Sequence, residues 1–269
     1  MFDSGVGGLT VLHECLVSLP EEDFVYLGDT AMFPYGTRDP DLLRERVRRI
    51  AELLLDDGAK LLVIACNTAT SIGEAVATEV AGRRGVEVVP VVEPQAEIAA
   101  AISDNGRVGV LATPNTVKSG SYRRALERQG RALAVTEVEA ADLAPFIQDG
   151  SHFDDGVVEM ARAYCAPLKA AGVDTLILGC THYPLVAPML QRILGRDVRL
   201  VSGGHAVAAA VQRTLESAGL SRERDGEGDY RFLCTGDVAS FRELGTRFLQ
   251  MPLGAVERIE VGGDYPLDR

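Results

Sequence analysis

Short apolar runs alternate along the chain with longer amphipathic stretches. The runs predicted to form strands are residues 24–28, 61–65, 86–92, 107–112, 132–138, 175–179, 198–201 and 230–234. Near-continuous apolar runs of this kind are typical of parallel strands that are covered on both faces. The clearest amphipathic helices are predicted at 42–55, 206–219 and 238–250. This alternation predicts βαβ units with right-handed crossovers, and therefore an α/β fold.

Two of the predicted strands end in the same way. The segments LLVIACNTAT (61–70) and TLILGCTHYP (175–184) each read as an apolar run, a small residue, a cysteine and then polar residues. In open α/β sheets, ligands bind beyond the carboxyl ends of the strands. We therefore interpret the two segments as halves of a pseudo-repeat, and expect Cys66 and Cys180 on opposite walls of a cleft.

Two opposed cysteines suit one kind of chemistry. A free thiol has a pKa of about 8.5, and a helix N-terminus or nearby donors can lower that pKa. Asn67, Thr68 and Thr181 follow the two cysteines, and residues of these types favour helix starts whose N–H groups can hold a carboxylate. A thiolate on one face of a carbon acid can remove a proton while a thiol on the other face returns one. Such a pair would invert a stereocentre without a cofactor.

Other motifs offer groups that could assist the two thiols. FDSGVGGLTV places Asp3 and Ser4 before a glycine-rich turn, and His182 lies two residues after Cys180. We expect Asp3 to serve one cysteine and His182 the other. GDTAMFPYG (28–36) follows another strand end, where Asp29 is equally explained as a functional residue or as a helix cap.

Composition and charge exclude several classes of protein. The chain has 269 residues, of which 46% are hydrophobic and 25% charged, and its formal net charge is −12. An acidic chain argues against a nucleic-acid partner, and we interpret the basic run RERVRR (44–49) as a solvated helix face. The apolar runs are too short to cross a membrane, and MFDSGVGG does not resemble a signal peptide. We expect a cytoplasmic protein.

The cysteines and histidines predict neither a disulfide framework nor a metal site. The five cysteines form no CxxC pair, and the four histidines show no zinc-like spacing with them. Cys15, Cys165 and Cys234 are expected to be packing residues. The GVGG turn lacks the patterns of a nucleotide-binding loop, so we do not expect a nucleotide cofactor.

Four motifs together are similar to one family. DSGVGGLTV, GDTAMFPYGTR, ACNTAT and GCTHYPL, in this order and at these spacings, resemble glutamate racemase, of the aspartate/glutamate racemase superfamily. The resemblance covers essentially the whole chain. It implies cofactor-independent conversion of L-glutamate to D-glutamate for peptidoglycan synthesis. It also implies two similar doubly wound parallel-sheet domains with the active site in the cleft between them, the first made of residues 1–91 and 204–269 and the second of residues 92–203.

The resemblance also implies roles for individual residues. Cys66 and Cys180 match the acid/base pair, and Asp3 and His182 match auxiliary catalytic residues. The positions that match substrate-binding residues are Ser4, Tyr35, Gly36, Asn67, Thr68, Thr113, Thr116 and Thr181. The implied partner is glutamate, with no metal and no cofactor. A homodimer is compatible with the resemblance, but the residues do not predict the oligomeric state.

The chain departs from the family pattern in three places. Family members usually carry several strand residues before the FDSG motif, Gln148 stands where a glutamate is common, and His205 and Ala206 lie in a stretch that is usually acidic. Two other functions therefore stay open. One is an aspartate racemase of the same superfamily, and the other is a non-catalytic amino-acid-binding relative.

Overall fold

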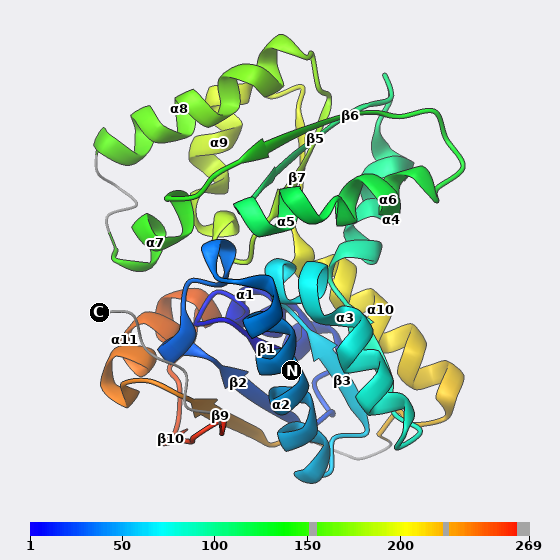
Figure 1. The fold of residues 1–269 in the computed structure, drawn as a ribbon, viewed down its shortest axis with the longest axis vertical. Coiled ribbons are helices and arrows are strands. Elements are labelled where there is room, and N and C mark those ends of the chain that lie inside the picture. The colour runs from blue at the N-terminus through cyan, green and yellow to red at the C-terminus, as the bar shows by residue number, and fades with distance from the viewer. Residues whose placement is uncertain (151–154, 223–225, 263–269) are drawn as a thin grey trace.

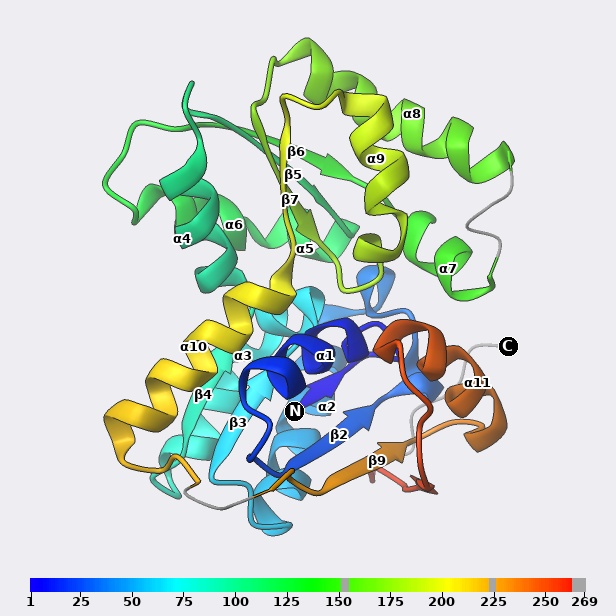
Figure 2. The same ribbon diagram turned by 180° about the vertical axis from the view of Figure 1, so that it is seen from behind.

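The computed structural model describes residues 1–150, 155–222 and 226–262. The chain forms two α/β domains, one above the other in Figures 1 and 2, and each is built on a parallel sheet with helices packed against it. The fold class predicted from the alternation of apolar and amphipathic segments is therefore confirmed.

The sheet of the first domain has the strand order β10-β9-β2-β1-β3-β4, and neighbouring strands are parallel. Its strands are β1 (Phe2–Asp3), β2 (Phe24–Gly28), β3 (Leu61–Ile64), β4 (Glu87–Pro90), β9 (Tyr230–Cys234) and β10 (Val256–Arg258). Its helices are α1 (Leu9–Ser18), α2 (Pro40–Asp56), α3 (Asn67–Gly82), α10 (Gly203–Ala218) and α11 (Val238–Leu249). Helix α2 packs against α3, and α1 packs against α10 and α11, so that the two groups cover opposite faces (Figures 1 and 2).

The sheet of the second domain has the order β6-β5-β7-β8, again with parallel neighbours. Its strands are β5 (Arg107–Ala112), β6 (Ala134–Glu139), β7 (Thr175–Gly179) and β8 (Arg199–Val201). Its helices are α4 (Val92–Ile102), α5 (Pro114–Ser119), α6 (Ser121–Glu127), α7 (Leu143–Gln148), α8 (Asp155–Ala170) and α9 (Ala187–Leu194). Short 3-10 helices complete the described chain, namely η1 (Thr30–Met32), η2 (Tyr35–Thr37) and η3 (Tyr183–Val186).

The chain passes between the domains twice. It enters the second domain after β4 and returns after β8, so the first sheet takes its strands from both ends of the sequence. Strand β9 pairs with β2 across the whole of β2, from Phe24 opposite Tyr230 to Gly28 opposite Cys234. The exact domain boundaries, 91/92 and 203/204, stay a prediction.

Helix α2 shows how the sequence specifies an element. Asp39 caps its N-terminus by accepting hydrogen bonds from the N–H groups of Asp41 and Leu42, and Pro40 occupies the first turn, where a missing N–H costs nothing. Its buried apolar face includes Leu43, Val47, Ile50 and Leu54, at the helical spacing.

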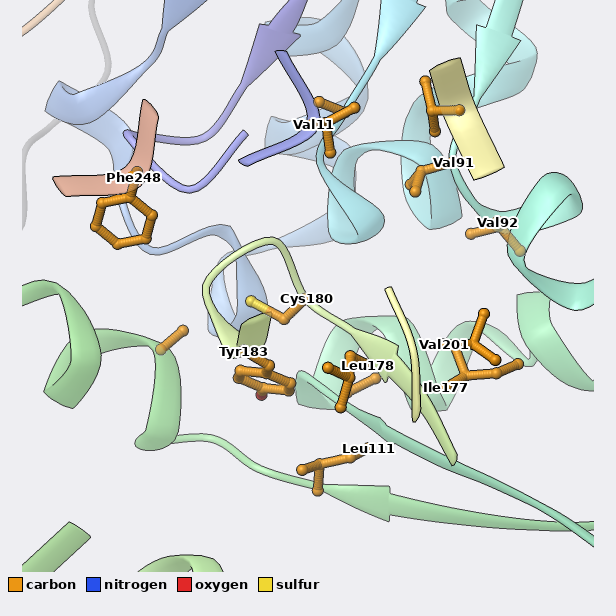
Figure 3. Close-up of a cluster of buried hydrophobic side chains, with 14 of the residues drawn as sticks. Val11, Val91, Val92, Leu111, Ile177, Leu178, Cys180, Tyr183, Val201 and Phe248 are labelled. Carbon is orange, nitrogen blue, oxygen red and sulfur yellow. The ribbon is translucent and has the colours of Figure 1, made fainter. Parts of the chain in front are cut away.

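Buried side chains form a continuous apolar cluster across the domain interface. The cluster shown in Figure 3 includes Val11 and Val91 of the first domain and Ile177, Leu178 and Val201 of the second. Complete burial of a side chain of this size contributes about 1.5–3 kcal/mol to stability. The two domains therefore share part of their apolar core where they meet.

Strand β1 is shorter than its neighbours. It pairs with the ends of β2 and β3 only, and a cavity of about 500 Å³ lies between Phe24 and Val25 of β2 and Leu61 and Val63 of β3. The Met1 amino group donates a hydrogen bond to the Val25 carbonyl oxygen at 2.8 Å, and burial lowers the pKa of this amino group to about 5.

Although the first strand is short, it supports Asp3 firmly, because Phe2 is fully buried and the strand is paired on both sides. Within the described ranges, none of the helices combines the length and the apolar character needed to span a membrane.

Candidate active site

The carboxyl ends of strands from both sheets face one small cavity. Its volume is about 20 Å³, which is room for about one water molecule. The lining residues are Ser4, Phe33, Pro34, Tyr35, Gly36, Cys66, Asn67, Thr68, Thr113, Ala144, Cys180, Thr181 and His182. The predicted cleft between the domains is therefore present, and Cys66 and Cys180 reach it from different domains.

Cys66 occupies the N-cap position of α3. Its Sγ accepts a hydrogen bond from the Ala69 N–H at 3.4 Å and donates one to Ser4 Oγ at 3.6 Å. Burial and, to a smaller extent, the neighbouring charge of Asp3 raise the pKa of the Cys66 thiol to about 12, although the Ala69 N–H acts to lower it. Desolvation therefore outweighs the helix N-terminus that was expected to activate this thiol.

Cys180 follows β7, but the segment after it is not a regular α-helix start. The chain turns through Thr181 and His182 into the 3-10 helix η3, so the two halves of the pseudo-repeat differ here. Burial raises the pKa of the Cys180 thiol well above its ordinary value, while the N–H groups of His182 and Tyr183 favour the thiolate. Figure 3 shows the Cys180 side chain on the loop that faces the first domain.

His182 contacts Cys180 directly. Its Nδ1 lies 3.8 Å from Cys180 Sγ, and its Nε2 lies 3.0 Å from Gln148 Oε1. Because Oε1 can only accept a hydrogen bond, Nε2 carries the proton and Nδ1 is left as an acceptor towards the thiol. The ring packs between Phe33 and Phe248, and burial lowers the pKa of His182 to about 3, so the imidazole is neutral.

Asp3 lies beneath the cavity rather than on its wall. Its fully buried carboxylate accepts hydrogen bonds from Gly5 N at 2.9 Å, Thr181 Oγ1 at 3.1 Å and Ser4 Oγ at 3.5 Å. Burial raises the pKa of Asp3 more than these donors lower it, and the pKa is about 6. Asp3 thus connects the two domains and contacts two residues of the cavity wall, Ser4 and Thr181.

The glycine-rich turn has a packing role. A Cβ at Gly7 would lie 2.4 Å from His182 Nδ1 and Thr181 Oγ1, so only glycine lets the turn approach the second domain this closely. This close approach explains the GVGG motif without a phosphate ligand.

Three threonine hydroxyls meet beside the cavity. Thr68 Oγ1 lies 2.9 Å from Thr113 Oγ1 and 3.3 Å from Thr116 Oγ1, and the latter two atoms are 3.1 Å apart. Thr68 belongs to the first domain, while Thr113 and Thr116 come from the second. Thr116 is fully buried and reaches the cavity only through the other two hydroxyls.

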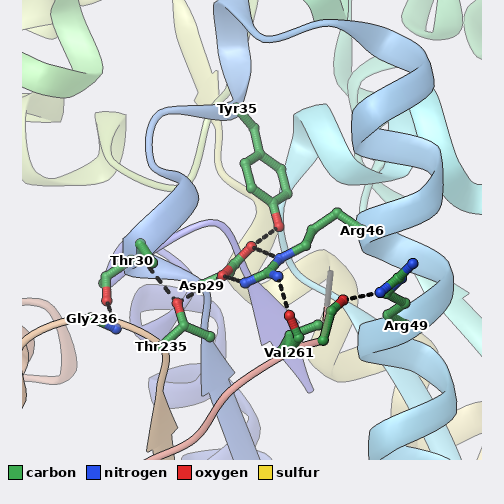
Figure 4. Close-up of polar contacts among 10 residues, drawn as sticks. Asp29, Thr30, Tyr35, Arg46, Arg49, Thr235, Gly236 and Val261 are labelled. Carbon is green, nitrogen blue, oxygen red and sulfur yellow. Dashed lines mark hydrogen bonds and ion pairs between the residues drawn. The ribbon is translucent and has the colours of Figure 1, made fainter. Parts of the chain in front are cut away.

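The Tyr35–Gly36 loop is fixed by an ion pair that the sequence did not reveal. Tyr35 donates a hydrogen bond from its hydroxyl to Asp29 Oδ2 at 2.5 Å, and Asp29 binds Arg46 through Nε at 2.8 Å and Nη2 at 2.6 Å (Figure 4). Arg46 is 4% exposed. The interpretation of the basic run as a solvated face is therefore wrong for Arg46.

Asp29 is neither a helix cap nor a residue of the cavity wall, the two roles that its position suggested. It accepts no capping hydrogen bond at η1, and its carboxylate instead holds Arg46, Tyr35 and Thr235, whose hydroxyl donates to Oδ1 at 2.7 Å. Nothing in the sequence pairs Asp29 with Arg46, because such contacts depend on how the domain folds.

Asn67 contacts two residues that sequence reasoning missed. Its Nδ2 lies 2.9 Å from Gln95 Oε1 and 2.6 Å from the Tyr122 hydroxyl, and both partners are fully buried in the second domain. Gln95 and Tyr122 lie in ordinary helical patterns, so no sequence signal marks them.

The other residues that the sequence analysis singled out do not line the cavity. His205 is exposed on α10 and pairs with Glu14 at 2.8 Å, while Ala206 is buried. Cys15, Cys165 and Cys234 are buried and free, as expected of packing residues. Lys and Arg do not occur among the residues that line the cavity. In the described part of the chain, no group of three or more His, Cys, Asp or Glu side chains is arranged to hold a metal ion.

Known proteins resemble this chain over nearly its whole length. A sequence model of the family described as Asp/Glu/hydantoin racemase matches residues 12–211. A glutamate racemase of Beutenbergia cavernae is 42% identical, and the match covers 99% of this chain and 94% of that protein.

Solved structures show the same architecture. A glutamate racemase isoform from Bacillus anthracis superposes with a TM-score of 0.91 at 33% identity, covering 96% of each chain. The glutamate racemase of Francisella tularensis, solved in complex with D-glutamate, gives a TM-score of 0.90 at 29% identity, covering 97% of this chain and 96% of that one.

Proposed function

The chain belongs to the Asp/Glu/hydantoin racemase family, and from this premise we propose that it interconverts L- and D-glutamate by proton transfer between Cys66 and Cys180. As a racemase it is an isomerase. The resemblance to glutamate racemases that four sequence motifs indicated is confirmed by relatives at this level of identity. The substrate and the two-cysteine mechanism are the parts that we propose.

The observation that carries the proposal is the placement of the two thiols. Cys66 and Cys180 line one cavity from different domains, each at the end of a parallel strand. A substrate bound between them presents one face of its α-carbon to each sulfur. Removal of the α-proton by a thiolate on one face, followed by donation from the thiol on the other, inverts the stereocentre. The thiolate has then become a thiol, and the thiol has become a thiolate. The total number of protons and electrons is therefore unchanged.

The cavity wall offers donors for the substrate carboxylates. Thr68 lies in the first turn of α3, a sixteen-residue helix whose N-terminal N–H groups favour an anion, and its hydroxyl meets those of Thr113 and Thr116. Ser4, Thr181 and the Tyr35–Gly36 loop supply further polar groups. Because the wall lacks Lys and Arg, carboxylate binding rests on these neutral donors.

His182 and Asp3 assist the two thiols. His182 Nδ1 is placed to accept a hydrogen bond from the Cys180 thiol, and the imidazole is neutral because burial lowers its pKa. Asp3 acts on the other side through Ser4, which receives a hydrogen bond from Cys66, and through Thr181. No direction of racemisation is assigned to either cysteine.

In its wider role, the protein would supply D-glutamate for peptidoglycan synthesis from the cytoplasm. A homodimer is the assembly to test, by measurement of molecular mass in solution.

The alternative function is an aspartate racemase. Aspartate is shorter than glutamate by one methylene group, which is worth about 1–3 kcal/mol in pocket fit. A larger kcat/KM for aspartate than for glutamate would overturn our choice of substrate.

The decisive experiment follows the α-proton by NMR in D₂O with L-glutamate as substrate. We expect the wild-type protein to lose the α-proton signal and to accumulate D-glutamate. Cys66→Ser and Cys180→Ser should each reduce racemisation by at least a thousandfold, since serine is a far weaker acid than cysteine at these positions. Cys165→Ser is the matched control, because this buried cysteine lies on α8, away from the cavity.

Each alternative predicts a different result. Racemisation that persists in either active-site variant would refute the two-thiol mechanism. Calorimetric binding of glutamate without deuterium incorporation in the wild type would favour the non-catalytic binding protein.

A further inference from the structure

The orientation of the Asn67 side chain is determined by two residues of the second domain. Asn67 directly follows Cys66, lines the cavity and is 3% exposed. Its amide faces Gln95 on α4 and Tyr122 on α6. These contacts cross from the first domain to the second beside a proposed catalytic cysteine.

Gln95 can adopt only one amide orientation. Its Nε2 lies 3.2 Å from the Leu178 carbonyl oxygen and 3.3 Å from the Val201 carbonyl oxygen, at the ends of β7 and β8. Main-chain carbonyls only accept hydrogen bonds, so the Gln95 NH₂ group must face them. Its oxygen, Oε1, must therefore face Asn67 and Tyr122.

This orientation fixes the next two groups in turn. Because Oε1 only accepts, the Asn67 atom at 2.9 Å has to be its NH₂ group, Nδ2. The Tyr122 hydroxyl donates its single proton to Gln95 Oε1 at 2.5 Å, so it accepts from Asn67 Nδ2 at 2.6 Å. Both N–H bonds of Asn67 are then used. The only side-chain atom that Asn67 can offer to a ligand is its carbonyl oxygen, Oδ1.

A hydrogen-bond acceptor in this position can bind only those groups of an amino acid that donate hydrogen bonds. At neutral pH both carboxylates of glutamate are ionised and lack donors, whereas the α-ammonium group carries only donors. We propose that Gln95 and Tyr122 are positioning residues that hold the Asn67 carbonyl oxygen towards the substrate ammonium group. This inference rests on the proposed function, since it assumes that an amino acid binds in this cavity. It assigns these two residues a part in distinguishing amino acids from dicarboxylates of the same length.

The test compares two ligands that differ only in the amino group. D-glutamate and glutarate are titrated calorimetrically into the wild-type protein and into Tyr122→Phe, which removes one hydroxyl and keeps the ring. We expect the Kd for D-glutamate to rise about tenfold, while the Kd for glutarate stays within twofold. In racemisation assays the change should appear mainly in KM rather than in kcat. Gln95→Met is a second variant that removes the amide and should produce the same selective loss.

Ser121→Ala is the matched control, because the neighbouring Ser121 hydroxyl also crosses the interface, to Ser71 Oγ at 2.7 Å. It should leave both Kd values unchanged. Equal weakening of D-glutamate and glutarate in Tyr122→Phe would mean a general loosening of the cavity and would overturn the inference, as would an unchanged Kd for D-glutamate. Failure of the proposed function would give a different result, namely no α-proton exchange in the wild type. The Kd values for D-glutamate and glutarate would still show whether Tyr122 positions Asn67.

Discussion

At the scale of single residues, the two thiols are held in an environment that opposes their ionisation. Burial raises the pKa of Cys66 to about 12 and also raises that of Cys180 well above its ordinary value, so both are thiols at neutral pH. A bound substrate ammonium group would bring positive charge to the same space and favour a thiolate. Formation of the reactive thiolate therefore depends on how closely this ammonium group approaches each sulfur, since the two substrate carboxylates oppose it.

Gln148 offers a way to test how His182 acts. Burial holds the pKa of His182 at about 3, and Gln148 Oε1, which accepts from Nε2, carries no charge. Gln148→Glu would place a carboxylate beside the ring and favour the imidazolium, so the pKa of His182 should rise. A protonated His182 carries a proton on Nδ1 and can no longer accept a hydrogen bond from the Cys180 thiol. We therefore expect the fall of kcat on acidification to begin at a higher pH in Gln148→Glu than in the wild type.

The measurement is kcat as a function of pH, together with NMR titration of the histidine ring protons. Gln212→Glu adds the same charge at an exposed position of α10 and should leave the profile as in the wild type. An unchanged acid limb in Gln148→Glu would show that the protonation state of His182 does not limit the reaction.

At the scale of elements, the Asp29–Arg46 pair joins segments that the sequence keeps apart. It connects the end of β2 to α2, and Arg46 Nη1 also donates to the Val261 carbonyl oxygen at 2.6 Å, near the end of the described chain (Figure 4). Tyr35 and Thr235 complete the shell of Asp29. The loop that carries Tyr35 and Gly36 to the cavity is therefore supported by a buried charge pair.

Removing one partner of this pair should be costly. Arg46→Met leaves the Asp29 carboxylate buried without its cation, and loss of one member of a buried pair typically costs about 3–5 kcal/mol. Urea unfolding measures this change in the free energy of unfolding. Arg83→Met, which breaks an exposed pair with Glu79 on α3, should cost only about 0.2–1 kcal/mol. Similar losses in the two variants would mean that the Asp29–Arg46 pair contributes no more than a surface contact.

The elements and motifs differ in how far the sequence predicts them. The strand at 107–112 and those at 175–179 and 230–234 were predicted with the observed bounds, because buried parallel strands are continuous apolar runs. The two-residue β1 and three-residue β10 are too short to produce such a pattern. Arg46 was misread because its partners, Asp29 and Val261, are 17 and 215 residues away in the sequence. Local pattern cannot specify contacts of that range.

At the scale of the whole molecule, the cavity between the domains is smaller than its proposed substrate. A volume of about 20 Å³ holds about one water molecule, and an amino acid is much larger. Polar contacts across the interface include Asp3 with Thr181 and Thr68 with Thr113. The cavity therefore has to widen before the substrate can bind, and we expect the two domains to move apart for entry and together again for catalysis, as in other enzymes whose domains close over a substrate.

Asn115 is well placed to stabilise the closed arrangement. Its Nδ2 donates to the carbonyl oxygens of Tyr35 at 3.0 Å and Arg38 at 2.8 Å, and so joins α5 of the second domain to the η2 loop of the first. Asn115 does not line the cavity. Asn115→Ala should therefore weaken closure without altering groups that contact the substrate.

Loss of two hydrogen bonds of this kind costs about 1–2 kcal/mol, so we expect KM for glutamate to rise roughly five- to thirtyfold in Asn115→Ala. Hydrogen exchange measured by mass spectrometry should show weaker protection of residues 33–38 in the substrate-bound variant than in the wild type. Asn105→Ala is the control, because Asn105 Nδ2 donates to the Gly172 carbonyl oxygen within the second domain. If KM and protection in Asn115→Ala match the control, then these two hydrogen bonds do not contribute to closure, and the other polar contacts and the shared apolar cluster hold the interface.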